Sequence, residues 1–547
     1  MVTPEQVPHP RETQIFPRLS AEMVTRMLPY GEVQYPEAGA YLFRRSERSV
    51  AFFVVLDGEV ALLDEEGDVV RAPLRSYGPG EFTGELYLFN HRAVLVSAQA
   101  GPGTRVLRIE REAFRKLAAS EADIGELLMR AFILRRVELI ATGFGGVTLL
   151  GSAYDAETHR IRAFLIRNGY PYRLLDPDSE EEAAALVATF ALDAADLPVL
   201  LTGDGAMLRN PGNADVADAL GLTERRDPDR VFDLIVVGAG PSGLAAAVYA
   251  ASEGLDTLVI EADAPGGQAG TSSRIENYLG FPTGISGQAL AGRAQVQAQK
   301  FGAQLAISRG ATGIDCGTRP FGITLEGGER VAGRSVLIAT GARYRRLSVP
   351  DYDRLEGCGI YYAATPMEAQ LCMGEEAVVV GGGNSAGQAA VFLARTCSHV
   401  HVLVRSAGLA ETMSDYLVQR IRNSPQITLH VFSEITAVAG DTYLSQVAWR
   451  DRRSGAETVR PVRNLFAMIG AEPNTGWLDG CVPLDDRGFV LTGSDAAGTP
   501  LASPYATRVP GIFAVGDVRS GSIKRVASGV GEGSVVVSAV HQFLGGA

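Results

Sequence analysis

Cysteine is scarce and scattered in this sequence. Five cysteines occur in 547 residues, at Cys316, Cys358, Cys372, Cys397 and Cys481. They form no Cys-x-x-Cys pair and no spacing typical of metal ligands, which argues against a disulfide scaffold and against a structural metal site. This usage suits a reducing compartment, so we expect a cytoplasmic protein.

A basic surplus and long apolar runs are also missing. Lys and Arg number 50 against 63 Asp and Glu, a net charge of −13. Nucleic acid is therefore not an expected partner, because neutralising phosphates needs clustered positive charge. No apolar run approaches the ~20 residues of a membrane helix. Residues 1–16 lack the basic-then-apolar layout of a secretory signal, so we expect none there.

What the sequence does contain is a strand–glycine–helix–strand unit at 233–261. An apolar run precedes Gly238, Gly240 and Gly243 in G-x-G-x-x-G spacing, and a second apolar run ends in Glu261. The glycines permit a tight turn and close approach of the backbone to a pyrophosphate at the helix N-terminus. Glu261 stands where a carboxylate accepts hydrogen bonds from ribose hydroxyls. The unit predicts a dinucleotide site.

A second unit of the same kind follows at 378–405. It has G-x-G-x-x-A spacing, and its second strand ends in an arginine instead of an acid. A guanidinium in place of the ribose-binding carboxylate favours a nucleotide with a 2′-phosphate, so this half predicts NADPH, with a preference over NADH that could be modest. The predicted NADPH-binding residues are Gly381, Gly383, Asn384, Ser385, Ala386 and Arg405.

Residues 231–547 resemble low-molecular-weight thioredoxin reductases, a type of pyridine-nucleotide-disulfide oxidoreductase. The resemblance rests on both glycine motifs, on GGQAGTSSRIENYLGFP at 266–282, on Ala-Thr-Gly at 339–341 and on Gly516-Asp517. It implies a homodimer whose FAD-binding domain, 231–346 and 466–547, encloses an NADPH-binding domain, 347–465. The residues implied to bind FAD are Gly238, Gly240, Pro241, Ser242, Gly243, Glu261, Gly267, Gln268, Asn277, Thr340, Gly341, Gly516, Asp517, Lys524 and Arg525.

The chain departs from that family at the redox dithiol. Thioredoxin reductases carry Cys-Ala-Thr-Cys shortly before the second glycine motif, where this chain has Ala363-Ala364-Thr365-Pro366. A relay through those thiols is therefore excluded. Related reductases without the dithiol act on ferredoxin or flavodoxin, which makes such a protein the leading predicted acceptor. The other predicted electron acceptors are a quinone, oxygen and a small dye-like molecule.

Two further features are weak candidates for a catalytic role. Cys372 is either a lone reactive thiol or a small buried residue before the next strand. Lys524 and Arg525 stand where the family typically has Arg-Gln beside the flavin. They would either add positive charge there, which favours anionic reduced flavin, or form surface salt bridges.

The N-terminal part, residues 1–142, is predicted to be β-rich with flanking helices, and Asp57-Gly58 and Glu66-Gly67 are plausible hairpin turns. Residues 78–93, GPGEFTGELYLFNHRA, resemble the phosphate-binding cassette of cyclic-nucleotide-binding domains. The resemblance implies that Glu85 holds the ribose 2′-hydroxyl and Arg92 the cyclic phosphate. The predicted ligand residues are Gly84, Glu85, Leu86, Arg92 and Ala93.

No Ser or Thr directly follows Arg92, which favours cAMP over cGMP as the ligand of this domain. The alternative is a domain that keeps the barrel and has lost its ligand.

Residues 148–222 resemble a thioredoxin or glutaredoxin fold. Pro198 matches the cis-proline that precedes the third strand of that fold. Residues 152–155, where the redox Cys-x-x-Cys would lie, contain no thiol, so thiol–disulfide exchange is excluded here. The domain is then either a groove that binds without reacting or a structural spacer.

The predicted fold class is α/β: two Rossmann-like three-layer domains, preceded by a β-roll cyclic-nucleotide-binding-like domain and a thioredoxin-like α/β domain. The predicted function is an NADPH-dependent FAD oxidoreductase regulated by a cyclic nucleotide. Two alternatives stay open. One is a cyclic-nucleotide sensor or scaffold whose flavin body has no turnover, and the other is a disulfide reductase that uses Cys372.

Overall fold

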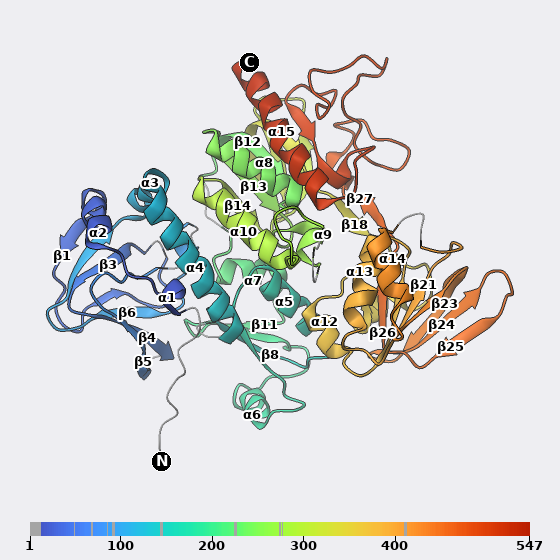
Figure 1. Cartoon of the computed structure of the whole chain (residues 1–547), viewed down its shortest axis with the longest axis horizontal. Helices are drawn as coiled ribbons and strands as arrows, with labels where there is room; N and C mark the ends of the chain where they lie inside the picture. Colours follow the sequence, from blue (N-terminus) through green and yellow to red (C-terminus); the bar gives the residue numbers. More distant parts are fainter. Residues whose placement is uncertain are drawn as a thin grey trace. The chain divides into compact units, whose positions relative to one another are not determined.

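The structure is a computed structural model of the chain, drawn in Figure 1. It describes residues 12–48, 50–66, 69–84, 86–89, 93–142, 146–223, 227–272, 275, 277–409 and 413–546. The chain divides into two compact units. The first comprises residues 1–152, 169–226 and 299–308, and the second comprises residues 153–168, 227–298 and 309–547.

The first unit begins with two β-sheets. One has the strand order β1-β7-β3, from Glu32–Gln34, Arg105–Ile109 and Phe52–Asp57. The other has the order β2-β6-β4-β5, from Tyr41–Phe43, Ser97–Ala100, Val60–Glu66 and Val69–Tyr77. The accompanying helices and 3-10 turns are α1 (Glu12–Ile15), α2 (Ala21–Met27), η1 (Leu28–Tyr30), η2 (Leu86–Leu88), α3 (Arg111–Ser120) and α4 (Ala122–Thr142).

The two predicted hairpin turns lie on either side of β4. Strands β4 and β5 pair antiparallel with Glu66 opposite Val69, as a hairpin at Glu66-Gly67 requires, and Gly67 itself lies outside the described residues. The prediction at Asp57-Gly58 is wrong, because β3 pairs with β7 whereas β4 pairs with β5 and β6. That turn carries the chain from one sheet to the other. Alternating side chains define a strand but not its partner.

A third sheet of the first unit has the order β11-β10-β8-β9. Its strands are β8 (Val147–Leu150), β9 (Tyr172–Leu175), β10 (Val199–Leu201) and β11 (Met207–Arg209). Strands β8 and β9 run parallel, and β10 is antiparallel to both β8 and β11. The Leu197–Pro198 peptide bond before the third strand is cis, as predicted. Helices α6 (Glu181–Thr189) and α7 (Asn213–Ala219) and strand β14 (Gln304–Ile307) also belong to this unit.

The second unit contains two Rossmann-like sheets (Figure 1). In the first, β13 (Thr257–Glu261), β12 (Val231–Val237), β17 (Arg330–Ile338), β16 (Phe321–Leu325) and β15 (Ala311–Asp315) lie in that order. Strand β28 (Ile512–Ala514) pairs with β17. The helices of this half are α8 (Pro241–Ser252), α9 (Gly267–Gly270), α10 (Gly287–Lys300) and α15 (Val526–Gly545), with η3 (Gly476–Leu478) and η4 (Gly516–Val518).

The second sheet is wholly parallel and has the order β19-β26-β20-β21-β22. Its strands are β19 (Ile360–Tyr361), β20 (Glu376–Val380), β21 (His399–Leu403), β22 (Ile427–His430) and β26 (Asn464–Ala467). The antiparallel sheet β23 (Ser433–Gly440), β24 (Leu444–Asp451) and β25 (Glu457–Arg460) belongs to the same half. Its helices are α11 (Tyr352–Leu355), α12 (Pro366–Leu371), α13 (Asn384–Leu393) and α14 (Asp415–Arg422).

The two halves of the second unit are joined by a two-stranded crossover. Strand β18 (Ala342–Tyr344) pairs antiparallel with β27 (Ala471–Pro473). The observed architecture confirms the predicted α/β fold class. Among the described helices, none is both long and apolar enough to cross a membrane. The four predicted domain boundaries stay predictions.

The sequence did not predict that two of the cysteines pair. Cys316, after β15, forms a disulfide with Cys481, after η3, and their Cα atoms are 6.0 Å apart. The other three cysteines, Cys358, Cys372 and Cys397, are buried free thiols. One bridge in a chain of this length is not a disulfide scaffold. Because 165 residues separate the two cysteines, their spacing in the sequence did not indicate that they pair.

We expect thiol titration to reveal this bridge. In denaturant without reductant, three thiols should react, those of Cys358, Cys372 and Cys397. All five cysteines of the chain should react after reduction. Peptide mapping under non-reducing conditions should join the peptides that contain Cys316 and Cys481. Five reactive thiols in the oxidised, unfolded protein would contradict the pairing.

Candidate functional site

The first glycine motif closes the turn between β12 and α8. Gly238 has φ +108, and a Cβ atom there would lie 2.3 Å from the carbonyl oxygen of Ala339. A Cβ atom on Gly243 would lie 1.9 Å from the carbonyl oxygen of Gly238. No real Cβ atom tolerates such distances, so both positions require glycine. They bring the helix against the strand.

Space remains where the pyrophosphate of a dinucleotide would lie. No atom lies within 4 Å of the place a Cβ on Gly240 would take. Gly240 is also the N-cap of α8 and offers no side-chain hydrogen bond to the helix, whose first residues include Pro241 and Ser242. The first N–H groups of the helix therefore lack a side-chain cap, and they face this space. An anionic group fits the observed cradle.

Glu261, the last residue of β13, stands beside this cradle. Its Oε2 accepts a hydrogen bond of 2.7 Å from the backbone N–H of Ala239, and its Oε1 accepts one of 3.1 Å from Asp263. Burial raises the pKa of the Glu261 carboxyl, while the two backbone donors oppose that rise. The carboxylate is thus fixed at the edge of the glycine loop, where it fits a ribose diol.

Helix α15 packs on α8 through glycines. Cβ atoms on Gly516 and Gly529 would lie 2.3 and 2.5 Å from the hydroxyl oxygen of Ser242. The backbone N–H of Gly516 donates to Glu532 at 2.6 Å, and Glu532 in turn binds Arg519. This packing fixes η4, which begins Gly516-Asp517. Burial raises the pKa of the Asp517 carboxyl.

A short helix and the crossover border the same half. Gln268, on α9 after Gly267, donates a side-chain hydrogen bond to the carbonyl of Ala342. Thr340, followed by Gly341, donates to the carbonyl of Asn474 at 2.8 Å, and the Asn474 amide donates back at 2.9 Å. Asn277 is exposed. The sequence did not single out Asn474, although it lies in the return segment into this half.

The second glycine motif repeats this geometry between β20 and α13. Gly381 has φ +142, and its Cβ would lie 2.2 Å from the carbonyl oxygen of Met468. Gly383, the N-cap of α13, has no atom within 4 Å of its Cβ position and provides no side-chain cap. Ala386 is fully buried on that helix. A second phosphate cradle therefore fits here.

The residues around the second cradle differ in exposure. Asn384 accepts a 2.7 Å hydrogen bond from the backbone of Ser414, and Ser385 is exposed. Arg405 is also exposed, two residues beyond the end of β21. Its position corresponds in the repeat to that of Glu261 in the first half. The two halves thus carry opposite charges at the ends of their second strands.

The chain matches the family described as pyridine nucleotide-disulphide oxidoreductase over residues 232–533, more than half of its length. The chain belongs to this family. Residues 33–121 match the cyclic nucleotide-binding domain. The predictions of a thioredoxin-reductase-like flavoprotein body, of an oxidoreductase and of an N-terminal cyclic-nucleotide-binding domain are confirmed.

Relatives agree with this assignment. The chain is 31% identical over 364 residues to NADPH-dependent thioredoxin reductase 3 of Arabidopsis thaliana, covering 62% of this chain and 66% of that protein. It is 32% identical over 322 residues to the thioredoxin reductase of Chlamydia pneumoniae, covering 57% and 98%. The structure of Lactococcus lactis thioredoxin reductase in the FR conformation matches with a TM-score of 0.53 and 28% identity, covering 58% and 100%. This chain thus spans just under two thirds of the plant relative's length.

Within this oxidoreductase body, residues 363–366 lie between β19 and α12 and contain no thiol. Glu368 accepts hydrogen bonds from the backbone and hydroxyl of Thr365 and is buried. The rings of Tyr344 and Tyr362 stack at 5.6 Å with an interplanar angle of 4°. Aromatic packing and a capped helix start therefore occupy this stretch.

The other catalytic candidates, Cys372, Lys524 and Arg525, differ in burial. Cys372 is fully buried, and the neighbouring Cys397 thiol, together with burial, raises the pKa of Cys372. A thiol in that state is a poor nucleophile. The Lys524 ammonium donates to the Asp517 carbonyl and to the Ser522 hydroxyl, and burial lowers its pKa. Arg525 is exposed at the N-cap of α15.

The cyclic-nucleotide cassette is described only in part. Glu85 and Arg92 lie outside the described residues. Gly84 has φ +110, and its carbonyl accepts a 2.9 Å hydrogen bond from the buried Arg135 on α4. Leu86 begins η2, and Ala93, the last residue of the cassette, is half-buried. Contacts from the C-terminal helix of the domain therefore reach the start of the cassette.

A histidine cluster makes the NADPH-type half sensitive to acid. Nδ1 of His401 lies 3.1 Å from Nε2 of His430, and Nε2 of His401 lies 3.2 Å from a carboxylate oxygen of Glu376. Burial lowers the pKa of His430 to about 4 from a reference of 6.5, and burial also lowers the pKa of His401. The unfolded chain therefore takes up protons that the folded protein resists. Stability present above pH 6.5 is lost as the pH falls toward 4.

We expect a lower urea midpoint at about pH 5 than at about pH 7.5. His430→Asn removes a group whose pKa changes on unfolding, so it should reduce this difference. An equal pH dependence in the wild type and in His430→Asn would contradict the assignment.

Proposed function

We propose that the protein is an NADPH-dependent FAD oxidoreductase. One observation carries the proposal: two uncapped helix N-termini face open glycine cradles, with Glu261 beside the first and Arg405 beside the second. A carboxylate suits the unmodified ribose of FAD, and a guanidinium suits the 2′-phosphate of NADPH. When bound, FAD would accept a hydride from NADPH and pass electrons to an acceptor.

The residues of this chain would bind and orient both nucleotides. Gly240, Gly267 and the start of α8 would hold the pyrophosphate of FAD, with Glu261 on its ribose. The η4 segment at Gly516-Asp517 would hold the flavin end, as in the thioredoxin reductases that this chain resembles. Gly383, Asn384, Ser385 and Arg405 would hold NADPH.

We propose an acceptor other than a protein disulfide reduced through a dithiol of this chain. Residues 363–366 carry no thiol, and Cys372 is buried with a raised pKa. A ferredoxin or flavodoxin is the leading class of acceptor, and a quinone is the next. The Cys372 alternative has its own test, because Cys372→Ala should then abolish any disulfide-reducing activity.

The N-terminal domain would adjust this activity by binding a cyclic nucleotide, with cAMP preferred over cGMP. A ligand there would act by shifting the population of orientations in which NADPH reaches the flavin. We further propose a cytoplasmic homodimer. Cross-linking and light scattering of the purified protein test the dimer directly.

The decisive experiment is anaerobic stopped-flow reduction of the flavin-loaded protein by NADPH and by NADH, with and without cAMP. Rapid bleaching by NADPH that changes with cAMP would support a regulated reductase. Slow or absent bleaching at every cAMP concentration would overturn the enzyme proposal. It would favour the alternative of a sensor whose flavin body has no turnover.

A further inference from the structure

Helix α5 (Ala156–Arg167) precedes the matched oxidoreductase region, yet it belongs to the second compact unit. Its start is set by Asp155, whose carboxylate accepts a 2.8 Å hydrogen bond from the backbone of Thr158. Ile161, Phe164 and Leu165 are buried along one face. The helix is therefore packed against its surroundings and is not a free linker.

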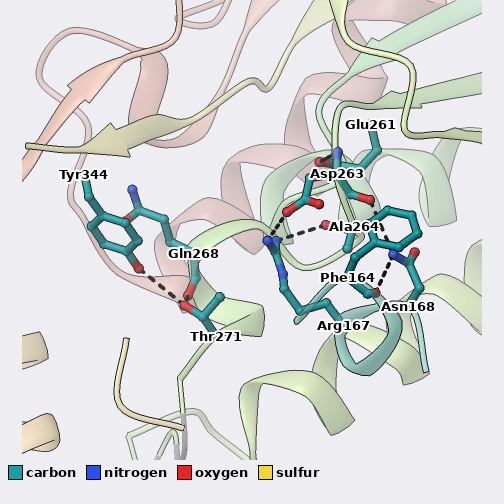
Figure 2. A network of polar contacts seen from close by, with 9 residues as sticks. All are labelled: Phe164, Arg167, Asn168, Glu261, Asp263, Ala264, Gln268, Thr271 and Tyr344. Carbon is teal, nitrogen blue, oxygen red and sulfur yellow. Dashed lines mark hydrogen bonds and ion pairs between the residues drawn. The ribbon is translucent and has the colours of Figure 1, made fainter. Parts of the chain in front are cut away.

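The C-terminal end of α5 contacts the loop after β13, as Figure 2 shows. The Arg167 guanidinium forms an ion pair with the Asp263 carboxylate and donates to the Ala264 carbonyl at 3.4 Å. The Asn168 amide donates to the carbonyls of Phe164 at 2.9 Å and of Asp263 at 3.4 Å. The loop is thus held at a carboxylate and at two backbone carbonyls.

A third anchor lies on α10. The side-chain amide of Gln288 donates to the carbonyl of Ile166, in the last turn of α5. The last carbonyls of a helix lack the usual partner four residues on, and the backbone N–H of the C-cap residue Asn168 also approaches this carbonyl. The end of α5 is therefore tied to two separate elements of the FAD-type half.

The same loop holds the ribose-binding acid. The backbone N–H of Asp263 donates to Oε1 of Glu261, whose Oε2 accepts from Ala239 in the glycine motif. A continuous series of contacts thus runs from Arg167 through Asp263 to Glu261 and the cradle. The positive charge of Arg167 also lowers the pKa of Glu261, against the effect of burial, and so favours the ionised carboxylate that a ribose diol needs.

The other end of α5 contacts the NADPH-type half. The ring of His159 lies 5.5 Å from that of Tyr361 on β19, and its Nε2 lies 3.9 Å from a carboxylate oxygen of Glu368 on α12. The ring of Tyr154, just before the helix, meets that of Tyr443 edge-on at 5.8 Å. One helix, about 18 Å long by its 12 residues, therefore contacts both nucleotide-binding halves.

We propose that Arg167 is a positioning residue for FAD, supplied by a helix outside the oxidoreductase region. By holding Asp263, it fixes the loop that presents Glu261 to the adenosine ribose. Anchoring α5 at both ends makes this position available before the cofactor arrives, so little ordering is needed on binding. The proposal rests on the proposed function, because it requires FAD in the first cradle.

The test measures FAD affinity of the full-length apoprotein, by flavin fluorescence, for the wild type and for Arg167→Ala. Because Asp263 is more than a third exposed, the ion pair by itself contributes little, and we expect the FAD dissociation constant to rise by about three- to tenfold through the loosened loop. Arg167→Lys should recover part of the loss. The KM for NADPH of the loaded protein should stay unchanged.

A matched control is Arg230→Ala. Arg230 forms a similar pair with Asp256, at 2.8 Å, near the opposite end of β12 and β13. This variant should lose comparable stability and keep wild-type FAD affinity. Asp263→Asn should resemble Arg167→Ala, and the double variant should not be additive, because both substitutions break one interaction.

Failure of the proposed function and failure of the inference about Arg167 give different results. If the wild-type apoprotein binds no FAD, the proposed function fails and the inference falls with it. If the wild type binds FAD and Arg167→Ala binds it within about twofold, the inference alone is overturned. An equal loss of affinity in Arg230→Ala would also overturn it, because the effect would then be one of general stability.

Discussion

Replacing Gly243 with alanine is expected to yield protein that purifies without flavin. The added Cβ would lie 1.9 Å from the carbonyl oxygen of Gly238, which is backbone and cannot turn aside. Helix α8 must then move away from β12, and its N-terminus leaves the phosphate cradle. Overpacking of this kind costs about 1–3 kcal/mol, and if all of it falls on the cofactor-binding conformation the loss of FAD affinity is about 5- to 150-fold. The measurement is the flavin absorbance per protein after reconstitution with FAD.

Gly292→Ala is the matched control for this substitution. Gly292 lies in α10 of the same half, and no atom lies within 4 Å of its Cβ position. Alanine should be tolerated there and should even favour the helix, since glycine is the poorer helix former. Full flavin content in Gly243→Ala would show that the first glycine motif does not hold the cofactor.

The second large effect is expected at Arg405. Arg405→Ala should raise the KM for NADPH about tenfold and leave the KM for NADH nearly unchanged, since a charge-assisted contact to phosphate contributes about 1.5–3 kcal/mol. The turnover number at saturating NADPH should change little, because the 2′-phosphate is remote from the hydride. Steady-state kinetics with both nucleotides and one fixed acceptor measure this.

Arg422→Ala serves as the control for charge alone. Arg422 is exposed in the last turn of α14, in the same half. Arg422→Ala removes one positive charge, as Arg405→Ala does, and it should not discriminate between NADPH and NADH. If both arginine variants raised the two KM values by equal factors, Arg405 would act through the general field and not as a phosphate contact.

Gly243→Ala and Arg405→Ala test the two nucleotide sites one at a time. The two sites resemble each other in backbone geometry. Gly238 and Gly381 both have positive φ, and both would place a Cβ against a carbonyl of the strand segment beside them. We therefore expect nucleotide specificity to depend on the residues at or just after the end of the second strand of each unit. Glu261 is held by two backbone donors, whereas Arg405 is exposed.

A candidate site could be predicted from the sequence where all of the residues that identify it lie in one short segment. A turn between a strand and a helix needs glycine at fixed spacings, so Gly238 and Gly243 reveal the fold around them. The loss of thiols at Ala363 and Pro366 is equally local, because no tertiary contact can supply a missing sulfur. Family membership followed from several such segments.

Only the tertiary structure decided which distant segments meet. The hairpin expected at Asp57-Gly58 fails because strand pairing depends on the partner and not on the strand itself. Cys316 and Cys481 pair across 165 residues, and no spacing announces such a contact.

The clearest case is helix α5. The sequence places it in a thioredoxin-like domain without redox cysteines, which leaves a groove or a spacer as the interpretations. The structure places Arg167 on Asp263, 96 residues away, beside the acid that the glycine motif requires. A sequence pattern determines a helix and its apolar face, because those depend on neighbours within a few residues. What that face covers depends on the packing of the whole chain, and only the folded structure contains it.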